Sequence, residues 1–139
     1  MQPLSSVDDY RFILPAPELR RYFSSYYFVE IATPGGIELD DLLYPEWASA
    51  RFMLDGMIPA SLVPDPVVPV PRASMTGPTS LACHVRCSFA RLAGIGMLPA
   101  GWSRFVGNSA SLYANAVFDV ETEPAFALFG AIWSDIKGL

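Results

Sequence analysis

Residues 94–107 read GIGMLPAGWSRFVG and divide the chain into two parts of different character. Before Pro99 the apolar residues run in the short stretches of strands, and after it they recur with the 3.6-residue period of helices. Gly94 and Gly96 indicate a bulge or a close approach within a strand. Pro99-Ala-Gly101 is typical of a turn that starts a helix. The stretch therefore predicts a joint between a layer of strands and a layer of helices.

The part before Pro99 is expected to hold strands after a short N-terminal helix that opens at Pro15. Asp55-Gly56 predicts a hairpin turn, and five prolines between Pro64 and Pro78 exclude a helix there. Alternation along one strand would place Ser49, Arg51 and Met53 on a single face. The expected strands cover 24–32, 37–44 (a strand or a loop), 45–54, 57–63, 73–75, 79–90 and 92–98.

Three helices are expected after Pro99. The first contains Trp102 and Phe105 and ends at Gly107. The second follows Ser109, and the third covers 124–136. That third helix is apolar nearly all round, which indicates burial or an interface; its candidate interface residues are Phe126, Leu128, Phe129, Ile132 and Trp133. The predicted fold is α+β: an antiparallel β-barrel or sandwich from 1 to 98, followed by helices from 99 to 139, in a single domain.

Composition limits the function. Of 139 residues, 52% are hydrophobic and 17% charged, so the chain can form a substantial core. The net charge is -5, and no run of Lys and Arg forms a stripe that could displace counterions from DNA. No apolar segment has the length of a membrane span, and the N-terminus lacks the pattern of a signal peptide. We therefore expect a cytoplasmic protein without a membrane partner.

The glycines of 94–107 do not form a phosphate-binding loop. Trp102 stands where a P-loop has Lys, and Pro99 stands where a dinucleotide fingerprint has its third glycine. The stretch Cys83-His84-x-x-Cys87 suggests a metal, but on a strand His84 points away from the two thiols. The chain has one His and no G-x-S-x-G. We predict no catalytic residue, no metal ligand and no cofactor.

A small-molecule pocket is a better use of the remaining polar residues. Trp47, Arg51, His84 and Arg86 are the candidates, because such sites combine apolar walls with a few placed polar groups. Arg51 lies in an otherwise apolar strand, and a buried guanidinium needs an anionic partner. That partner is either a ligand carboxylate or, as the preferred interpretation, Glu46 or Asp55 at a strand edge.

Three stretches together resemble the N-terminal regulatory region of AraC-type transcriptional regulators. They are LLYPEWASARFMLDG, ASMTGPTS and GIGMLPAGWSRFVGNSASLYANAVFDVE, within residues 15–135. The positions that carry the resemblance are Pro45, Trp47, Phe52, Leu54, Gly56, Gly77, Pro78, Gly94, Pro99, Gly101, Ala114, Asn115, Val117 and Asp119.

The resemblance implies a cupin-like barrel joined to helices that dimerise or contact a DNA-binding domain. In the family two helix-turn-helix units follow, and this chain stops at Leu139 without them. The chain is therefore expected to be a regulatory domain that forms a homodimer and contacts DNA only through an absent C-terminal part.

Three functions follow from this sequence. The leading hypothesis is a sensor and dimerisation domain in which a small effector shifts the helices between two arrangements. The alternative is a stand-alone cupin-like binding protein or enzyme, although a single His cannot build the metal site usual in such enzymes. In a third interpretation the aromatic residues fill the barrel, and the domain serves only for assembly.

Overall fold

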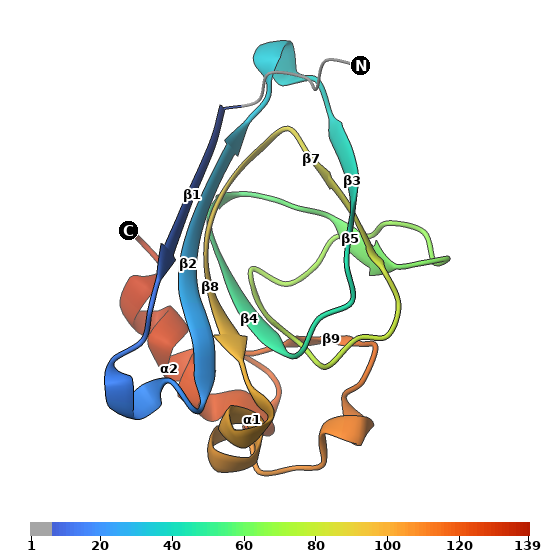
Figure 1. Ribbon diagram of the computed structural model, residues 1–139. Coiled ribbons are helices and arrows are strands. Elements are labelled where there is room, and N and C mark those ends of the chain that lie inside the picture. Colours follow the sequence, from blue (N-terminus) through green and yellow to red (C-terminus); the bar gives the residue numbers. More distant parts are fainter. Residues whose placement is uncertain (1–6) are drawn as a thin grey trace.

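The computed structural model describes residues 7–139 as two antiparallel sheets and two α-helices (Figure 1). The large sheet has the order β1 (Val7–Ile13), β2 (Phe23–Ala32), β8 (Phe89–Met97), β4 (Ser49–Gly56), β6 (Ala73–Thr76) and β9 (Val117–Asp119). The small sheet has the order β3 (Leu39–Leu43), β7 (Cys83–Cys87) and β5 (Ala60–Leu62). The helices are α1 (Pro99–Phe105) and α2 (Ala127–Ile136), and 3₁₀ turns cover Pro17–Leu19, Pro34–Gly36, Ala110–Leu112 and Pro124–Phe126. The predicted α+β class with antiparallel strands is confirmed.

One face of the large sheet packs against the helices. Ala50 and Phe52 of β4 are fully buried there, and the Phe52 ring stacks on Trp133 of α2 at a centroid distance of 6.1 Å. Trp102 of α1 is also buried, and its ring meets Phe126 edge to face at 5.9 Å. The predicted joint is thereby confirmed: α1 begins directly after β8 and places Trp102 between the layers.

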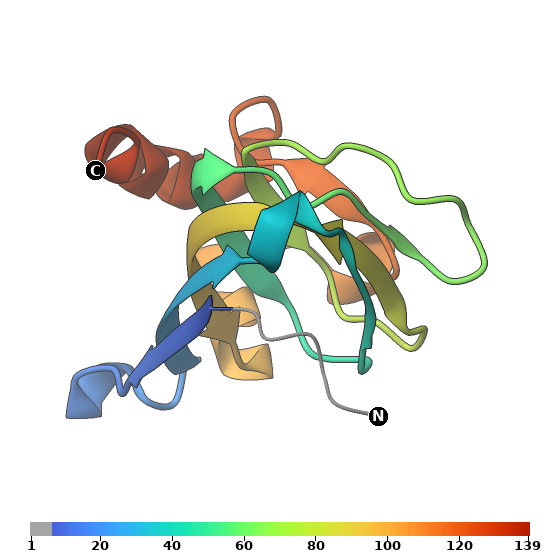
Figure 2. The same cartoon turned by 90° about the horizontal axis from the view of Figure 1, so that it is seen from above.

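The opposite face of the large sheet packs against the small sheet. A second apolar cluster joins Ile31, Met53, Ala90 and Leu92 of the large sheet to Cys87 of β7. Figure 2 shows α2 on one side of the large sheet and the small sheet on the other. Strands of the large sheet thus alternate between two apolar clusters, one on each face, as their period of two requires.

The hairpin predicted at Asp55-Gly56 is wrong. Both residues continue β4 and pair with Arg91 and Ala90 of β8, after a register shift beyond Met53. Gly56 adopts a φ of 68°, and a Cβ there would meet the Phe89 carbonyl oxygen at 2.3 Å. The glycine therefore lets the chain leave the large sheet, and β5 pairs with β7 of the small sheet instead of with β4.

The second helix predicted after Pro99 is also wrong, so two α-helices lie in that part of the chain where three were expected. The short helix predicted from Pro15 is only a 3₁₀ turn over Pro17–Leu19. A single 3₁₀ turn ends at Leu112, and Asn115 then adopts a left-handed φ of 55° that stops any helix. The Asn115 side-chain oxygen accepts a hydrogen bond from the Ser80 N–H at 2.9 Å. Val117–Asp119 pairs with β6, which supplies partners for its backbone N–H and C=O groups.

Strand boundaries differ in two further places. The strand predicted over 79–90 is shorter, because β7 covers Cys83–Cys87 and Phe89 already belongs to β8. Sequence reasoning missed β1, whose whole length pairs with residues 26–32 of β2. Gly107 ends α1 as predicted, with a φ of 86° and its N–H bonded to the Trp102 carbonyl at 3.0 Å.

Candidate functional site

The candidate site lies on the inner face of the large sheet, where it is turned toward the small sheet. Ser49 and Arg51 share this face of β4 and stand opposite Gly96 and Gly94 of β8. On the other side of β4 they stand opposite Thr76 and Ser74 of β6. Polar residues thus meet in the middle of the sheet, beside an apolar cluster on the same face.

Arg51 is the central charged group of this face. Its side chain is about one quarter exposed and forms an ion pair with Glu46. It also donates a hydrogen bond to Thr76 Oγ1 at 3.3 Å. Burial acts against the charge of Arg51, whereas Tyr27 and Glu46 favour it, and the net effect raises its pKa. The pair with Glu46 confirms the preferred prediction, but β4 lies between β8 and β6 and is not an edge.

Tyr27 closes one side of the site. It stands opposite Gly94, and its hydroxyl reaches the Ser49 hydroxyl at 2.7 Å. A Cβ on Gly94 would lie 2.0 Å from the tyrosine ring. The close approach predicted for Gly94 is therefore confirmed, and its purpose is to let the ring lie across β8.

Cys83 of β7 is the residue of the small sheet that is influenced by Arg51 and Glu46. Burial raises the pKa of its thiol, the Arg51 charge lowers it and the Glu46 charge raises it. The charges of Arg51 and Glu46 thus act on this thiol in opposite directions. The thiol remains protonated at neutral pH, which suits a wall of the site better than a nucleophile.

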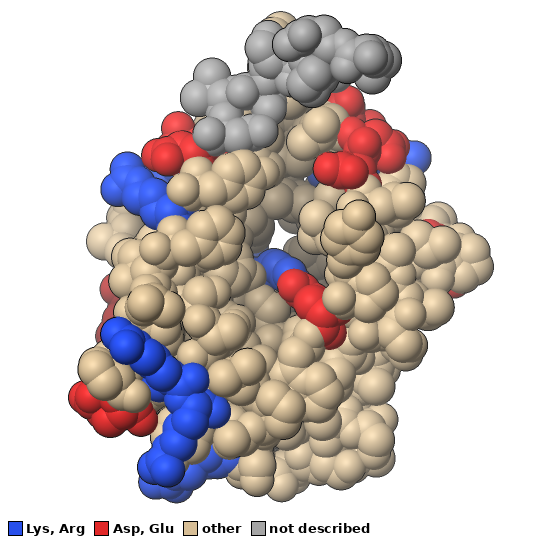
Figure 3. Space-filling model, in the orientation of Figure 1, with Lys and Arg blue, Asp and Glu red and all other residues tan. Residues whose placement is uncertain are grey.

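The surface of the molecule is hollowed near the centre of one face. Figure 3 shows a depression in the centre of the molecule, in which basic and acidic atoms adjoin one another. In the same orientation, β4 and β8 lie on one side of the open centre, and β3 and β7 lie on the other (Figure 1). An ion pair bordered by hydroxyl groups and an apolar cluster is a suitable lining for a small polar molecule.

The other predicted site residues do not converge on Arg51. His84 and Arg86 alternate with Cys83 along β7 and lie on its opposite face. His84 Nε2 donates to Asp40 Oδ1 at 2.5 Å, and Arg86 Nε donates to Asp40 Oδ2 at 3.0 Å. Hydrogen bonding from His84, followed by that from Arg86, holds the pKa of Asp40 below its usual 3.8. This cluster joins β3 to β7 on the outside of the small sheet.

Trp47 precedes β4 and is 37% exposed. Sequence reasoning singled out Arg51, with Glu46 or Asp55 as its partner, but missed Tyr27, Ser49, Thr76 and Cys83. The glycines of β8 were the available signal, because a glycine inside a strand often makes room for a large side chain on its neighbour.

The residues predicted for an interface fall into two groups. Phe126, Phe129 and Trp133 are buried in the core of this chain, where they face the large sheet. Leu128 is exposed and Ile132 is partly buried. Only these last two can contact another molecule.

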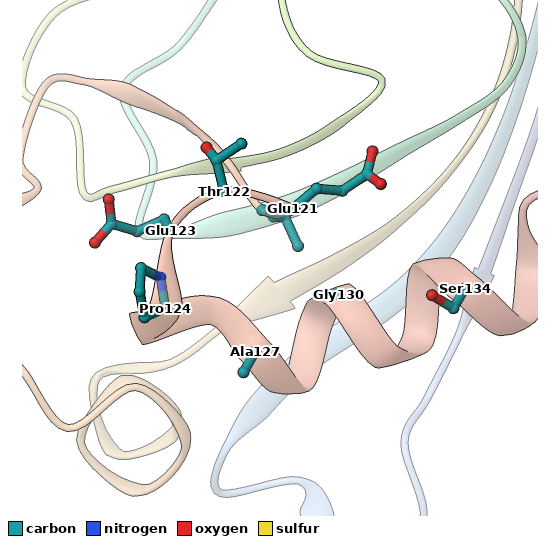
Figure 4. Close-up of a pocket in the computed structure, with 8 residues that line it drawn as sticks. Glu121, Thr122, Glu123, Pro124, Ala127, Gly130 and Ser134 are labelled. Carbon is teal, nitrogen blue, oxygen red and sulfur yellow. The ribbon is translucent and has the colours of Figure 1, made fainter.

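A surface pocket of about 320 Å³ lies between the turn after β9 and α2. Figure 4 shows Glu121 and Glu123 at this turn, with Ala127, Gly130 and Ser134 following along the helix. Its lining residues are Val120, Glu121, Thr122, Glu123, Pro124, Ala127, Gly130 and Ser134. The lining holds two carboxylates and no Lys, Arg or His, so this pocket lacks a positive charge that could bind an anion.

Comparisons with protein families, curated proteins and solved structures find no match to this chain. Within residues 7–139, no helix has the length and apolar character of a membrane span, and no three metal-binding side chains cluster. The site must therefore be interpreted from its own geometry.

Proposed function

We propose that this chain is the sensor domain of a cytoplasmic transcriptional regulator, and that it binds a small anionic effector between its two sheets without catalysis. The observation that carries the proposal is the position of Arg51, a cation only one quarter exposed on the central strand β4, on the face turned toward the small sheet. The resemblance to AraC-type regulatory regions adds homodimer formation and DNA contact through a further domain. The same resemblance implies a cupin-like barrel, which stays a proposal.

Arg51 suits a carboxylate ligand. A guanidinium carries five N–H donors in a planar fork that matches two carboxylate oxygens. Glu46 and Thr76 Oγ1 accept from two of its nitrogens in the structure. Glu46 lies in the segment before β4 with its side chain nearly half exposed, so it can turn outward when a ligand replaces it.

The rest of the lining selects the body of the ligand. Tyr27, Ser49 and Thr76 offer hydroxyl groups close to the guanidinium. Farther along the same face, Met53 and Leu92 belong to the apolar cluster between the sheets. A carboxylic acid with a short apolar or aromatic body fits this order of polar and apolar groups.

A path from the ligand to the helices runs through β4. Arg51 and Phe52 are adjacent and point to opposite faces. Phe52 stacks on Trp133, so a displacement of β4 changes the packing of α2. An effector that binds one arrangement of α2 more tightly would shift the population toward it.

Calorimetric titration with phenylacetate, hexanoate and benzylamine tests the proposal. We expect the two carboxylates to bind and the amine not to bind. Arg51→Gln should abolish binding, and Glu46→Gln should strengthen it, because the competing carboxylate is gone. Arg86→Gln on the outer face of the small sheet is the matched control and should bind like the native chain. Absence of carboxylate binding, or binding that survives Arg51→Gln, contradicts the proposal.

The alternative, a stand-alone binding protein, uses the same site. The two functions differ in assembly. A sensor that signals through a dimer changes the dimer population or its helix packing when phenylacetate binds. A stand-alone protein binds phenylacetate as a monomer. Light scattering with and without phenylacetate separates the two functions.

A further inference from the structure

Strand β1 forms one edge of the large sheet. Among residues 7–139 its only strand neighbour is β2, and in Figures 1 and 2 it lies at the margin of the molecule. Its apolar side chains are nevertheless exposed: Tyr10 is 52% exposed, Phe12 70% and Ile13 49%. Leu14, directly after the strand, is exposed as well. Natural proteins usually shorten or charge such edges, because an open apolar edge pairs with another strand.

Two residues of opposite charge lie close together on β1. Asp9 and Arg11 flank Tyr10 and lie on one face of β1. In the single chain they form an ion pair at 3.4 Å, with both side chains more than half exposed. Exposed pairs of this kind contribute little to stability, so both groups are available to a second strand.

We propose that two copies of this chain pair β1 with β1 in antiparallel orientation, about a two-fold axis at Tyr10. This register sets Tyr10 opposite Tyr10 of the second copy. It also sets Asp9 opposite Arg11 of the second copy, and the symmetry repeats that pair on the other side. The two large sheets become one continuous sheet. The inference gives the homodimer of the proposed function its surface and does not depend on the ligand.

The other candidate surface is α2, which exposes fewer of its predicted interface residues. Three of its five predicted interface residues are buried in the chain's own core, which leaves Leu128 and Ile132. The edge of β1 offers backbone donors and acceptors as well as aromatic surface and charges, so it specifies both a partner and a register.

Charge exchange tests the pairing. Asp9→Arg and Arg11→Asp each set like charges opposite one another twice in the dimer, and each should weaken dimerisation about tenfold or more. The double exchange Asp9→Arg/Arg11→Asp should restore it. An equimolar mixture of the two single variants should form a heterodimer, since each supplies what the other lacks. Leu128→Glu is the matched control and should dimerise normally. Sedimentation equilibrium measures all five samples, and circular dichroism verifies that each is folded.

Cross-linking tests the register. Residues directly opposite in an antiparallel pair have Cα atoms about 4.5–5.5 Å apart, within the range of a disulfide. Tyr10→Cys should therefore form a disulfide-linked dimer on oxidation. Phe12→Cys should not, because the two copies of that residue lie about 13 Å apart in this register.

A monomer at every concentration overturns the pairing, as does a dimer that ignores both charge reversals and is broken by Leu128→Glu. Either result leaves phenylacetate binding by Arg51 unaffected, so the failure of the dimer surface and the failure of the ligand site remain distinguishable.

Discussion

The hydroxyl groups of Tyr27 and Ser49 lie 2.7 Å apart although β8 separates their strands. The tyrosine ring spans this strand in the space that a side chain on Gly94 would occupy. One glycine thus positions an aromatic wall beside Arg51, and the shape of the site is fixed within the sheet.

Gly94→Ala should destabilise the chain by about 2–4 kcal/mol, because the ring must move and the Tyr27–Ser49 bond is lost. Chemical denaturation measures the change in the free energy of unfolding. Gly130→Ala in α2 is the control: its Cβ would meet the Val120 carbonyl oxygen at 3.6 Å, an ordinary contact. That variant should gain up to about 1 kcal/mol from helix propensity. Equal effects of the two substitutions would contradict the account of Gly94.

Alkylation of Cys83 should respond in opposite directions to its two charged neighbours. The Glu46 charge raises the pKa of the thiol, so Glu46→Gln should increase the rate with iodoacetamide. The Arg51 charge lowers that pKa, so Arg51→Gln should decrease the rate. Peptide mass spectrometry separates Cys83 from the buried Cys87. Rates that shift in the same direction would show that the three groups do not share one electrostatic environment.

Asp40 should make the stability depend on acid pH. Its pKa is lowered in the folded chain, so it stabilises the fold above its usual value of 3.8. This contribution is lost as the pH falls below 3.8 and through the lowered pKa. Asp40→Asn should therefore be less stable than the native chain at pH 7 and equal to it at the acid end.

Two further variants, measured over the same pH range, test whether Asp40 and its hydrogen bond from His84 cause the loss of stability in acid. His84→Gln removes the largest cause of the shift and should reduce the acid-dependent difference, whereas Asp135→Asn in α2 should leave it unchanged. If the difference in the free energy of unfolding between the native chain and Asp40→Asn is the same at all pH values, the role of the His84 hydrogen bond is contradicted.

Much of the fold could be predicted from local patterns. Pro99 and Gly101 give the start of α1, and the alternation in 49–54 gives the two faces of β4. The local pattern at Asp55-Gly56 wrongly predicted a hairpin, because both residues pair with β8, which is distant in the sequence. Pairing of β9 with β6 is likewise a long-range contact that overrides a weak helical pattern.

The candidate site was predictable only in part. Arg51 was conspicuous as a cation in an apolar strand, and Glu46 and Asp55 were its two predicted acidic partners. The structure pairs it with Glu46. Cys83 and Thr76 reach the site from other strands, so no spacing along the chain indicates them. His84 and Arg86 were grouped with Arg51 by residue type, whereas the alternation of β7 sends them to the outer face.

The central claim is that an anion binds between the sheets at Arg51, and amide chemical shifts during a phenylacetate titration test it most directly. The account predicts saturable shifts in β4, β6 and β7, which Arg51→Gln removes and Glu46→Gln moves to lower ligand concentration. Shifts confined to other strands, or shifts in β4 that persist in Arg51→Gln, would contradict it.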